Sequence, residues 1–563
     1  MRRLFSASVF VLGVIGNMSL VRAQLGPIDP GRIQQELQPP QVPARPLEEL
    51  RIPESEGPQP PPGSKDIRFL LRRLELEGNT VFSAEQLEPL YRDQLGTEIT
   101  LADLYAIAER LNNFYRREGY ILTRVLVPEQ RIEKGVVQLR VIEGFVETVK
   151  FQGVTPAQEQ RLRGFADAIQ RSRPLQLSTL ERNLLLMNDL AGFAVRGRLE
   201  PGQQVGGTAL TINVSYDPFD PFFEINNWAP YSIGPVRLQA GVFLNSLGNQ
   251  GERIGLSAAT TPFDFEELAN GRIDFRIPIG FDGVTLSTSA SYTSTQPGAE
   301  LKRFRLSGES FYWNIGLSYP VIRSRVLNLY LNGQFDLINS TIDTRFLGEP
   351  VVLSRDRLRI LRVGASVSNI NQLGFTGASI LLSQGLPGLG ARLEGTPNIP
   401  LSRANGQATA FKVNLDFTQL FTLPGQFNLL FTGAGQVAST SLLVSEQFGL
   451  GGPSFGSAYN PSQLLGDDGY ALRLELQRPV NYQVGTTPMI SQPYAFVDYG
   501  QMFLKKPTAA EPRERDLASA GFGLRQFISN YLQVRLELAF PLVKIGPQFE
   551  QTPRLLFSGQ GVF

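Results

Sequence analysis

Apolar and polar residues alternate in short runs from about residue 218 to the end of the chain. In the segment 327–337, leucine or phenylalanine occupies most of the odd-numbered positions, and asparagine, glutamine, tyrosine or aspartate lies between them. The alternation recurs in 472–477 and 532–538, where Arg, Glu or Gln lies between leucine or valine. A period of two places the two sets on opposite faces of a strand. Because the second face carries full charges, the pattern favours a membrane barrel with an apolar outside and a wet lumen.

The region 218–563 divides into 16 predicted strands, which suits a single-chain outer-membrane barrel whose two ends lie on one side. Its longest connection, roughly 441–467, is rich in Gly and Ser, and we expect it to face outward or to fold into the lumen. A soluble β-sandwich is the alternative. The N-terminal signal, the charged second face and the terminal Phe563 favour the barrel. The strands are expected to begin near residues 222, 236, 251, 270, 283, 307, 326, 357, 374, 408, 426, 468, 491, 514, 530 and 553.

Residues 65–144 change to a mixed pattern and predict a small module with the order β-α-α-β-β. Thr100 and Asp103 have the spacing of a capping box, which predicts the start of a helix with one apolar face. The expected strands span 69–77, 121–127 and 136–142, and the expected helices span 84–95 and the residues after Thr100.

Residues 145–217 repeat this order and predict a second module of the same kind. Gly119 precedes Pro128 by nine positions, and Gly192 precedes Pro201 by nine positions, with a predicted strand between them in each case. Self-similarity at one spacing points to tandem modules, although two copies are a weak repeat and chance is the alternative. The expected strands span 147–151, 193–199 and 208–214, and the expected helices span 155–171 and the residues after a second capping box, Ser178 to Glu181.

The N-terminus has the pattern of a secretory signal peptide over residues 1–23, with two arginines before an apolar core and a small-residue cleavage site. Residues 24–64 are rich in proline and predict an extended, semi-rigid tether. Within it, Asp29 and Pro30 form a start signal for a short helix over 31–37, which is too short to be stable alone in water. Such a helix needs a host surface, and a plain linker is the alternative.

The composition excludes several classes of function. The chain has no cysteine, which excludes disulfides and thiolate metal sites, and no histidine, which excludes a Ser-His-Asp triad. No pair of carboxylates stands out as an acid and a base, and no phosphate-binding loop of the G-x-x-x-x-G-K-[ST] type is present. Its 53 basic and 52 acidic residues give no electrostatic case for nucleic acid. We therefore expect no enzyme activity, no catalytic residue, no metal and no cofactor.

Short motifs along the chain match one family in the order in which that family carries them. They are Gly119, Tyr120, Pro128, Gln130, Gly135, Glu143 and Gly144 in the first module, Gly451, Gly452, Gly456, Ser457 and Tyr459 in the long connection, and Phe496, Asp498 and Gly500 of an FxDxG signature in the thirteenth strand. With the two modules and the 16 strands, they make the chain resemble the outer-membrane transporters of two-partner secretion, the ShlB/FhaC/HecB type. The modules of that family and of the related BamA-type insertases are called POTRA domains.

The resemblance implies a mainly β fold, with a 16-stranded transmembrane barrel in the cell outer membrane behind two α+β POTRA-like domains in the periplasm. It implies a translocase that captures an unfolded secreted client of the haemolysin or adhesin type and passes it through the barrel. Outer-membrane lipid and the barrel-assembly machinery, needed for its own insertion, are the other expected partners. The motif residues from Gly119 to Gly144 are then candidates for client binding, by addition of an extended client segment to an edge strand.

The chain departs from the family at one position. The family carries an arginine in the long loop, which is expected to meet the FxDxG aspartate in the lumen, whereas this chain has Ser457. A serine cannot form the bidentate guanidinium–carboxylate pair, so Asp498 needs another donor, either water or a wall arginine such as Arg473. The contact between loop and wall is then weak, and Ser457→Arg is expected to tighten it by about 1 to 3 kcal/mol.

Two other functions stay open at this point. An outer-membrane insertase of the BamA or TamA type typically has more POTRA modules and lacks the proline-rich tether. A passive solute porin needs neither the two modules nor the long-loop motif. The translocase is the interpretation that uses the tether, the modules and the loop together.

Overall fold

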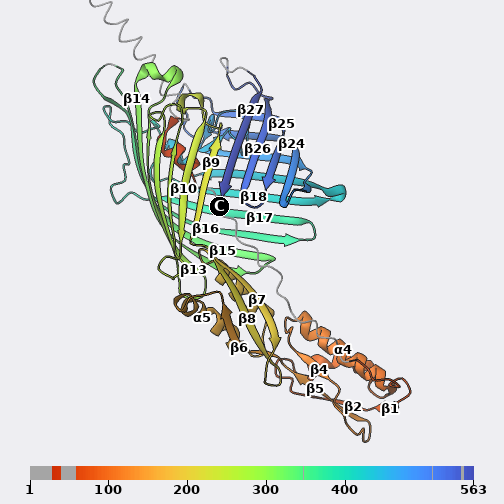
Figure 1. Ribbon diagram of the computed structural model, residues 1–563. Helices are drawn as coiled ribbons and strands as arrows, with labels where there is room; N and C mark the ends of the chain where they lie inside the picture. Colours follow the sequence, from red (N-terminus) through yellow and green to blue (C-terminus); the bar gives the residue numbers. More distant parts are fainter. Residues whose placement is uncertain (1–27, 40–58, 347, 510, 547–550) are drawn as a thin grey trace, which may run out of the picture.

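The computed structural model describes residues 28–39, 59–346, 348–509, 511–546 and 551–563. The strands from residue 219 onward form one barrel, and two small modules follow one another away from one of its ends (Figure 1). A short helix, α2 (Pro30–Glu36), lies inside the barrel. No helix in these ranges is long and apolar enough to cross a membrane. The expected signal peptide and most of the proline-rich tether lie outside the described residues.

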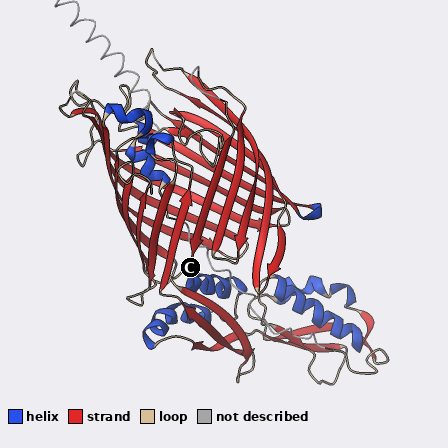
Figure 2. Cartoon of the chain, turned by 45° about the horizontal axis from the view of Figure 1, so that its top comes forward, coloured by secondary structure: helices blue, strands red, loops and turns tan. Residues whose placement is uncertain are grey.

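The first module packs one long helix against a three-stranded sheet (Figure 2). Its elements are β1 (Arg68–Leu71), β2 (Arg73–Glu77), α3 (Ala84–Leu87), the 3-10 turns η2 (Glu88–Leu90) and η3 (Arg92–Gln94), β3 (Thr97–Thr100), α4 (Leu101–Arg117), β4 (Arg124–Leu126) and β5 (Val136–Ile142). The sheet has the order β2-β5-β4, with β2 parallel and β4 antiparallel to β5. Leu104, Leu111 and Tyr115 of α4 are buried against Val137 and Leu139 of β5. The capping box of α4 is present as predicted.

Two predictions for this module are wrong. The strand expected over 69–77 is two strands, because the backbone N–H groups of Arg72 and Arg73 both donate to the carbonyl of Gly135, at 2.8 and 3.1 Å. This bend leaves β1 to pair with β3, a strand that the pattern did not predict. The first expected helix ends after one turn and continues as two 3-10 turns, because Pro89 cannot donate a hydrogen bond within a helix.

The second module repeats this arrangement. Its elements are β6 (Phe145–Gln152), α5 (Pro156–Arg171), α6 (Leu177–Asn188), β7 (Phe193–Pro201) and β8 (Gly207–Tyr216). The sheet order is β6-β8-β7, with β6 parallel and β7 antiparallel to β8, as in the first module. The capping box expected at Ser178 is wrong, since α6 begins at Leu177 without a side-chain cap. Instead, the N–H of Leu177 donates to the carbonyl of Gly119 in the first module, at 2.9 Å.

Among the described residues, 17 strand segments form the barrel wall. They are β9 (Phe219–Asn226), β10 (Arg237–Asn245), β11 (Arg253–Thr260), β12 (Ala269–Ile279), β13 (Val284–Thr295), β14 (Leu306–Arg323), β15 (Leu327–Thr344), β16 (Val351–Asn371), β17 (Gly374–Gly385), β18 (Phe411–Leu423), β19 (Phe427–Ala438), β22 (Asp468–Gln477), β23 (Val480–Val484), β24 (Thr487–Phe503), β25 (Glu514–Ile528), β26 (Leu532–Pro541) and β27 (Arg554–Val562). Because β22 and β23 pair end to end with β24, the closed sheet has 16 positions, as the alternation predicted.

The wall strands have the two faces that the sequence pattern predicted. On β22, Leu472, Leu474 and Leu476 point outward and are 41 to 44% exposed. Arg473 and Glu475, between them, point into the lumen and are 6% and 1% exposed. The apolar set therefore faces lipid, and the charged set is enclosed by the barrel.

Guanidinium groups from both sides fix the second module beneath the barrel. Arg161 of α5 donates to the carbonyls of Gln250 and Gly280 in two turns of the barrel, both at 3.0 Å. In the opposite direction, Arg323 of β14 donates to both carboxylate oxygens of Asp189, at 2.7 and 2.8 Å. These contacts hold the module at a set position below the lumen.

The protein is expected to require detergent for extraction and to migrate faster on a gel before heating than after it. A closed sheet has no unpaired edge, so it resists cold SDS and unfolds only on heating. Semi-native electrophoresis of the outer-membrane fraction makes the measurement. Truncation before residue 554 removes β27, leaves two open edges and should abolish the fast-migrating band. Recovery of the full chain as a soluble periplasmic protein would contradict the barrel.

Candidate functional site in the barrel lumen

The connection between β19 and β22, residues 439–467, folds back into the barrel. Its middle forms a hairpin of β20 (Phe448–Leu450) and β21 (Leu464–Gly466), which lies against β22, β24 and β25. Gly451 turns the chain out of β20 with a backbone φ of +105°, a conformation that residues with a Cβ rarely adopt. Of the two positions expected for this loop, outward or in the lumen, the structure has the second.

The loop and the FxDxG strand are in close contact. A Cβ on Gly500 would lie 2.6 Å from Cδ2 of Leu450, so a larger residue would push the loop off the wall. A Cβ on Gly456 would lie 2.7 Å from Leu517 of β25. The glycines of the two motifs thus lie on both sides of one interface, and the structure brings the motifs together.

Tyr459 fixes the loop tip to the wall on its other side. Its side chain is 1% exposed, and its hydroxyl lies 2.6 Å from the carbonyl oxygen of Val543 and 3.0 Å from that of Ala518. The N–H of Val543 donates to the same hydroxyl at 3.1 Å. The carbonyl of Tyr459 accepts hydrogen bonds from Arg554 at 2.6 Å and from the N–H of Gly452 at 3.2 Å. The tyrosine of the loop motif is therefore a structural anchor.

The guanidinium of Arg473 on β22 is a further contact between the loop tip and the wall. Its Nη1 donates to Oγ of Ser457 at 2.9 Å and lies 3.4 Å from Oδ2 of Asp498. Its Nη2 lies 3.2 Å from Glu475 and 3.1 Å from Glu537. All five side chains are buried. The wall thus supplies the arginine that the loop lacks, which is one of the two donors expected for Asp498.

The charges around this guanidinium are matched without any contribution from the loop. Arg525 donates to Glu475 at 2.9 Å, and Arg535 pairs with Glu537. With Asp498 included, three guanidiniums face three carboxylates. We call these six side chains the Arg473 network.

The FxDxG residues hold the centre of this network in place. The guanidinium of Arg473 lies over the ring of Phe496, 3.7 Å from its centroid. Asp498 accepts hydrogen bonds from the N–H of Ser519 at 3.1 Å and from its hydroxyl at 2.6 Å. The wall therefore supplies most of the partners of Asp498, and the loop adds the backbone N–H of Gly456 to Asp498 and the hydroxyl of Ser457 to Arg473.

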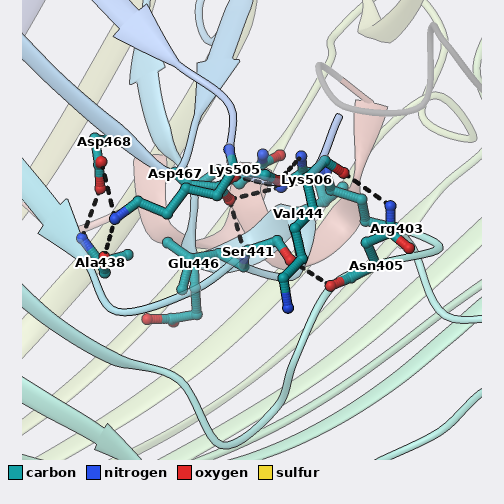
Figure 3. A network of polar contacts seen from close by, with 12 residues as sticks. Arg403, Asn405, Ala438, Ser441, Val444, Glu446, Asp467, Asp468, Lys505 and Lys506 are labelled. Carbon is teal, nitrogen blue, oxygen red and sulfur yellow. Dashed lines mark hydrogen bonds and ion pairs between the residues drawn. The ribbon is translucent and has the colours of Figure 1, made fainter. Parts of the chain in front are cut away.

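A second set of polar contacts holds the base of the loop (Figure 3). Asp467 is fully buried and accepts two hydrogen bonds from Nη1 of Arg403, at 2.6 and 2.7 Å. It also accepts from the N–H of Lys505 at 2.6 Å. Arg403 comes from the connection between β17 and β18, and Lys505 from the connection between β24 and β25. One carboxylate therefore ties three loops together.

Glu446, near the start of the same loop, is a third point of attachment. Its carboxylate lies 2.9 Å from Arg362 of β16 and 2.9 Å from Lys412 of β18. Arg362 also pairs with Asp336 at 2.5 Å, and the side chains of all four residues are mostly buried. The loop is thus anchored by anionic side chains near both of its ends.

The helix α2 lies between the loop and the opposite wall. Asp29 accepts from the N–H of Arg32 at 3.1 Å and caps the helix, as its sequence predicted. Gln34 donates to the carbonyl of Ser291 at 2.9 Å and accepts from the hydroxyl of Ser310 at 2.8 Å. Of the two alternatives for this segment, helix and plain linker, the structure has a helix, and its host surface is the lumen.

Arg32 attaches this helix to the loop. Its Nη1 donates to the carbonyls of Gln447 and Val444, at 2.7 and 3.1 Å. Its Nη2 donates to the hydroxyl of Ser462 at 2.9 Å. On the other side, Glu36 pairs with Arg237 of β10 at 3.1 Å. The helix and the loop therefore both occupy the lumen, and they are in contact with each other.

The motif residues of the first module lie outside the lumen, several of them where the two modules join. The carbonyls of Gly119 and Gly144 accept hydrogen bonds from the N–H groups of Leu177 and Leu175, both at 2.9 Å. Tyr120 accepts through its hydroxyl from the side chain of Gln176 at 2.9 Å. These three motif residues connect the modules, and client binding at them stays a prediction.

The remaining motif residues stabilise the first module itself. Glu143 accepts a hydrogen bond from the N–H of Thr80 at 2.8 Å. Burial of the Tyr115 phenol raises its pKa, and the negative charge of Glu143 raises it further. Gln130 contacts the carbonyl of Pro128 at 3.3 Å. The carbonyl of Gly135 accepts the two backbone hydrogen bonds at the bend between β1 and β2. The structure thus gives each of these residues a local structural role.

The sequence did not predict four of the side chains that anchor the loop and the helix. They are Arg32, Arg403, Glu446 and Asp467. Isolated acidic residues in a Gly- and Ser-rich loop are a signal that could have identified Glu446 and Asp467. No local signal marks Arg403, because its partner lies 64 residues away in the sequence.

The Arg473 network reverses the expected effect of Ser457→Arg. A second guanidinium would be buried beside Arg473 with no spare carboxylate, so the change should loosen the loop rather than tighten it. We expect more open-channel events in a planar bilayer and faster protease cleavage of the loop. Ser457→Ala removes one hydrogen bond to a charged group, worth about 1.5 to 3 kcal/mol, and should loosen the loop less than Ser457→Arg does.

The double variant Ser457→Arg with Arg473→Ser moves the arginine from the wall to the loop and keeps the number of charges. It should restore the resting conductance. If the single variant is tighter than wild type, or the double variant is no better than the single one, Arg473 is not the partner of the loop.

Two family models match this chain. The model described as haemolysin secretion/activation protein ShlB/FhaC/HecB matches residues 206–526. The model described as POTRA domain, ShlB-type, matches residues 69–144, which contain the first module. The two matches together cover the first module and most of the barrel, including the long loop.

Similar proteins and structures agree with these matches. The heme/hemopexin transporter protein HuxB of Haemophilus influenzae is 23% identical over 553 residues, 95% of each chain. The hemolysin transporter protein ShlB of Serratia marcescens is 26% identical over 400 residues, 70% of this chain and 69% of its own. The structure of CdiB from Escherichia coli has the same fold, with a TM-score of 0.70 at 19% identity over 98% of this chain and 99% of that one. Because the first model spans more than half of the residues, the chain belongs to the haemolysin secretion/activation protein ShlB/FhaC/HecB family, whose members are outer-membrane transporters.

Proposed function

We propose that this protein takes a large, unfolded partner of the haemolysin or adhesin type from the periplasm and passes it through the barrel to the cell surface. The observation that carries the proposal is the filling of the lumen. The helix α2 and the loop 439–467 occupy it and are held by side-chain hydrogen bonds and ion pairs. Both can leave without breaking a strand pair of the wall. A passive porin needs neither element, and the haemolysin transporter among the relatives supports a protein client.

At its tip, the loop can leave the Arg473 network without separating an ion pair of that network. When it moves, Arg473 keeps its three carboxylates and loses only the hydrogen bond to Ser457. A hydrogen bond to a charged group contributes about 1.5 to 3 kcal/mol, whereas separating a buried ion pair costs about 3 to 5 kcal/mol. A loop that carried the arginine itself would have to break such a pair. The wall arginine therefore favours opening.

The periplasmic modules are the expected site of client capture, by addition of extended client segments to sheet edges. The sequence has no nucleotide-binding motif, so we expect passage to be driven by binding and by folding of the client outside the cell. We expect no catalytic activity, and the barrel-assembly machinery is the expected partner for insertion of the protein itself.

An insertase would release its client sideways, between the first and last strands. Here this seam is paired from Phe222 to Asn226. Beyond it, the side-chain amide of Asn227 accepts from the N–H of Phe557 at 2.8 Å and donates to the carbonyl of Leu555 at 2.9 Å. The closed seam supports passage through the lumen over release into lipid.

Removal of the helix should open the channel. Deletion of residues 24–38 is expected to raise ion conductance in a planar bilayer, because the polar contacts of α2 with the wall and the loop are lost together. Arg32→Ala should raise the frequency of open events as well, since it removes four hydrogen bonds to the loop. Gln38→Ala is the matched control, because this side chain is exposed. Unchanged conductance after the deletion would mean that α2 does not close the lumen.

Surface delivery tests the function directly. The chain is expressed together with a candidate client, a large secreted protein of the haemolysin or adhesin type, and the client is measured at the cell surface by protease access and antibody binding. Delivery is expected with the wild-type chain and not with a variant that lacks residues 65–217. Equal amounts of client at the surface with and without the transporter would rule the proposal out.

A further inference from the structure

Side-chain amides occupy edges of the sheets in both periplasmic modules. In the first module, β4 is an edge strand, and Val125 is its middle residue. The N–H of Val125 donates to Oδ1 of Asn112 at 2.7 Å, and Nδ2 of Asn112 donates back to the carbonyl of Val125 at 3.4 Å. Since residues of an antiparallel strand alternate between inner and outer bonding, these two groups are the outer edge of the three-residue strand.

The second module has the same arrangement. The N–H of Val195, in the edge strand β7, donates to Oδ1 of Asn188 at 2.7 Å. Nδ2 of Asn188 donates to the carbonyl of Val195 at 3.3 Å. In each module the asparagine comes from the helix that precedes the edge strand, although the separations in sequence differ, 13 and 7 residues. The contact is therefore a property of the module and not of one local turn.

Gln130 makes a third contact of this kind. The pairing of β4 with β5 ends at Leu126, opposite Arg140, so β5 has no neighbouring strand at Gln138 on that side. There the N–H of Gln138 donates to Oε1 of Gln130, and Nε2 of Gln130 donates to the carbonyl of Gln138, both at 2.8 Å. One of the sequence-predicted client-binding residues thus occupies the edge to which a client would add.

The chemistry of these contacts identifies what could replace them. A primary amide offers one acceptor and N–H donors, so it matches the N–H and C=O of a peptide group. Each of the three side chains takes the place of one residue of an absent neighbouring strand. The backbone of an extended polypeptide would satisfy the same groups without loss of hydrogen bonds.

The position of Asn188 connects this edge to the lumen. Asn188 lines a cavity of about 300 Å³ between the second module and the floor of the barrel, together with Phe193 of β7 and Arg276 and Tyr330 of the wall. An extended chain that displaced Asn188 from Val195 would therefore lie at the entrance of the lumen.

We propose that Asn112, Gln130 and Asn188 are displaceable guards of the sheet edges. In the resting protein they occupy the backbone groups of Val125, Gln138 and Val195, and an extended segment of the secreted client takes their place there. The inference rests on the proposed export function and names where the client backbone pairs.

Binding of a strand-forming peptide to the full-length protein in nanodiscs tests the proposal. The probe is a fluorescent twelve-residue peptide of alternating valine and threonine, measured by fluorescence anisotropy. Asn112→Ala and Asn188→Ala are each expected to bind it roughly tenfold more tightly than wild type, because the peptide no longer competes with two internal hydrogen bonds. Asn113→Ala, an exposed neighbour on α4, is the matched control and should bind like wild type.

Two further measurements keep the test independent of folding. Asn112→Asp retains the acceptor for the N–H of Val125 and loses only the donor, so it should fold and show a smaller gain in affinity. The same peptide with alternate N-methyl groups cannot donate along one edge and should lose the gain. Peptide binding by all three variants equal to that of Asn113→Ala would mean that the amides only join helix to sheet. Dimers of the variants without bound peptide would assign the edges to a second copy and overturn the client assignment.

Secretion plays no part in this measurement. A failure of the export function would appear separately, as absence of client at the surface of cells that carry the wild-type chain.

Discussion

Every backbone N–H and C=O group that crosses lipid must find its partner inside the protein, and this chain meets that constraint by closing its sheet. Closure has a consequence for the inner face. Its charged side chains are then surrounded by protein, and each needs an opposite charge or a hydrogen bond. The wall supplies most of these itself, as in the Arg473 network, and the loop and α2 supply the rest. The loop and α2, which occupy the lumen, thus also provide partners for charged side chains of its inner face.

The location of one arginine decides whether the loop tip breaks an ion pair when it leaves the Arg473 network. A guanidinium on the loop would have to be pulled away from a buried carboxylate, and both charges would be left without partners. On β22, the same group stays among Glu475, Asp498 and Glu537 whether the loop is present or not. The serine at 457 is therefore not a loss of the contact but a change in which side carries the charge. The balance of three guanidiniums and three carboxylates is what makes an added arginine unfavourable.

The sequence predicted the barrel well, because strands that face lipid on one side must alternate strictly, and a period of two is visible without any neighbour. It predicted the caps of α2 and α4 for the same reason, since a capping contact spans only three residues. The split between β1 and β2 was missed, because it depends on the carbonyl of Gly135, more than sixty residues away. The start of α6 was misplaced for a similar reason, since its cap is the carbonyl of Gly119 in another module. The partners of Arg32 and Arg403 were likewise beyond reach, because no spacing within a strand or loop encodes them.

The arginine contacts between the second module and the barrel have a mechanical meaning. A chain drawn outward by its own folding pulls on whatever holds its trailing part, and the reaction force passes into the module. Arg161 on two turn carbonyls and Arg323 on Asp189 carry that load in parallel, from opposite sides of the joint. Several bonds that share a load must fail together, so the joint resists tension better than any one of them would alone. Under the proposed function, the edge of β7 would then keep its position below the lumen while the client passes.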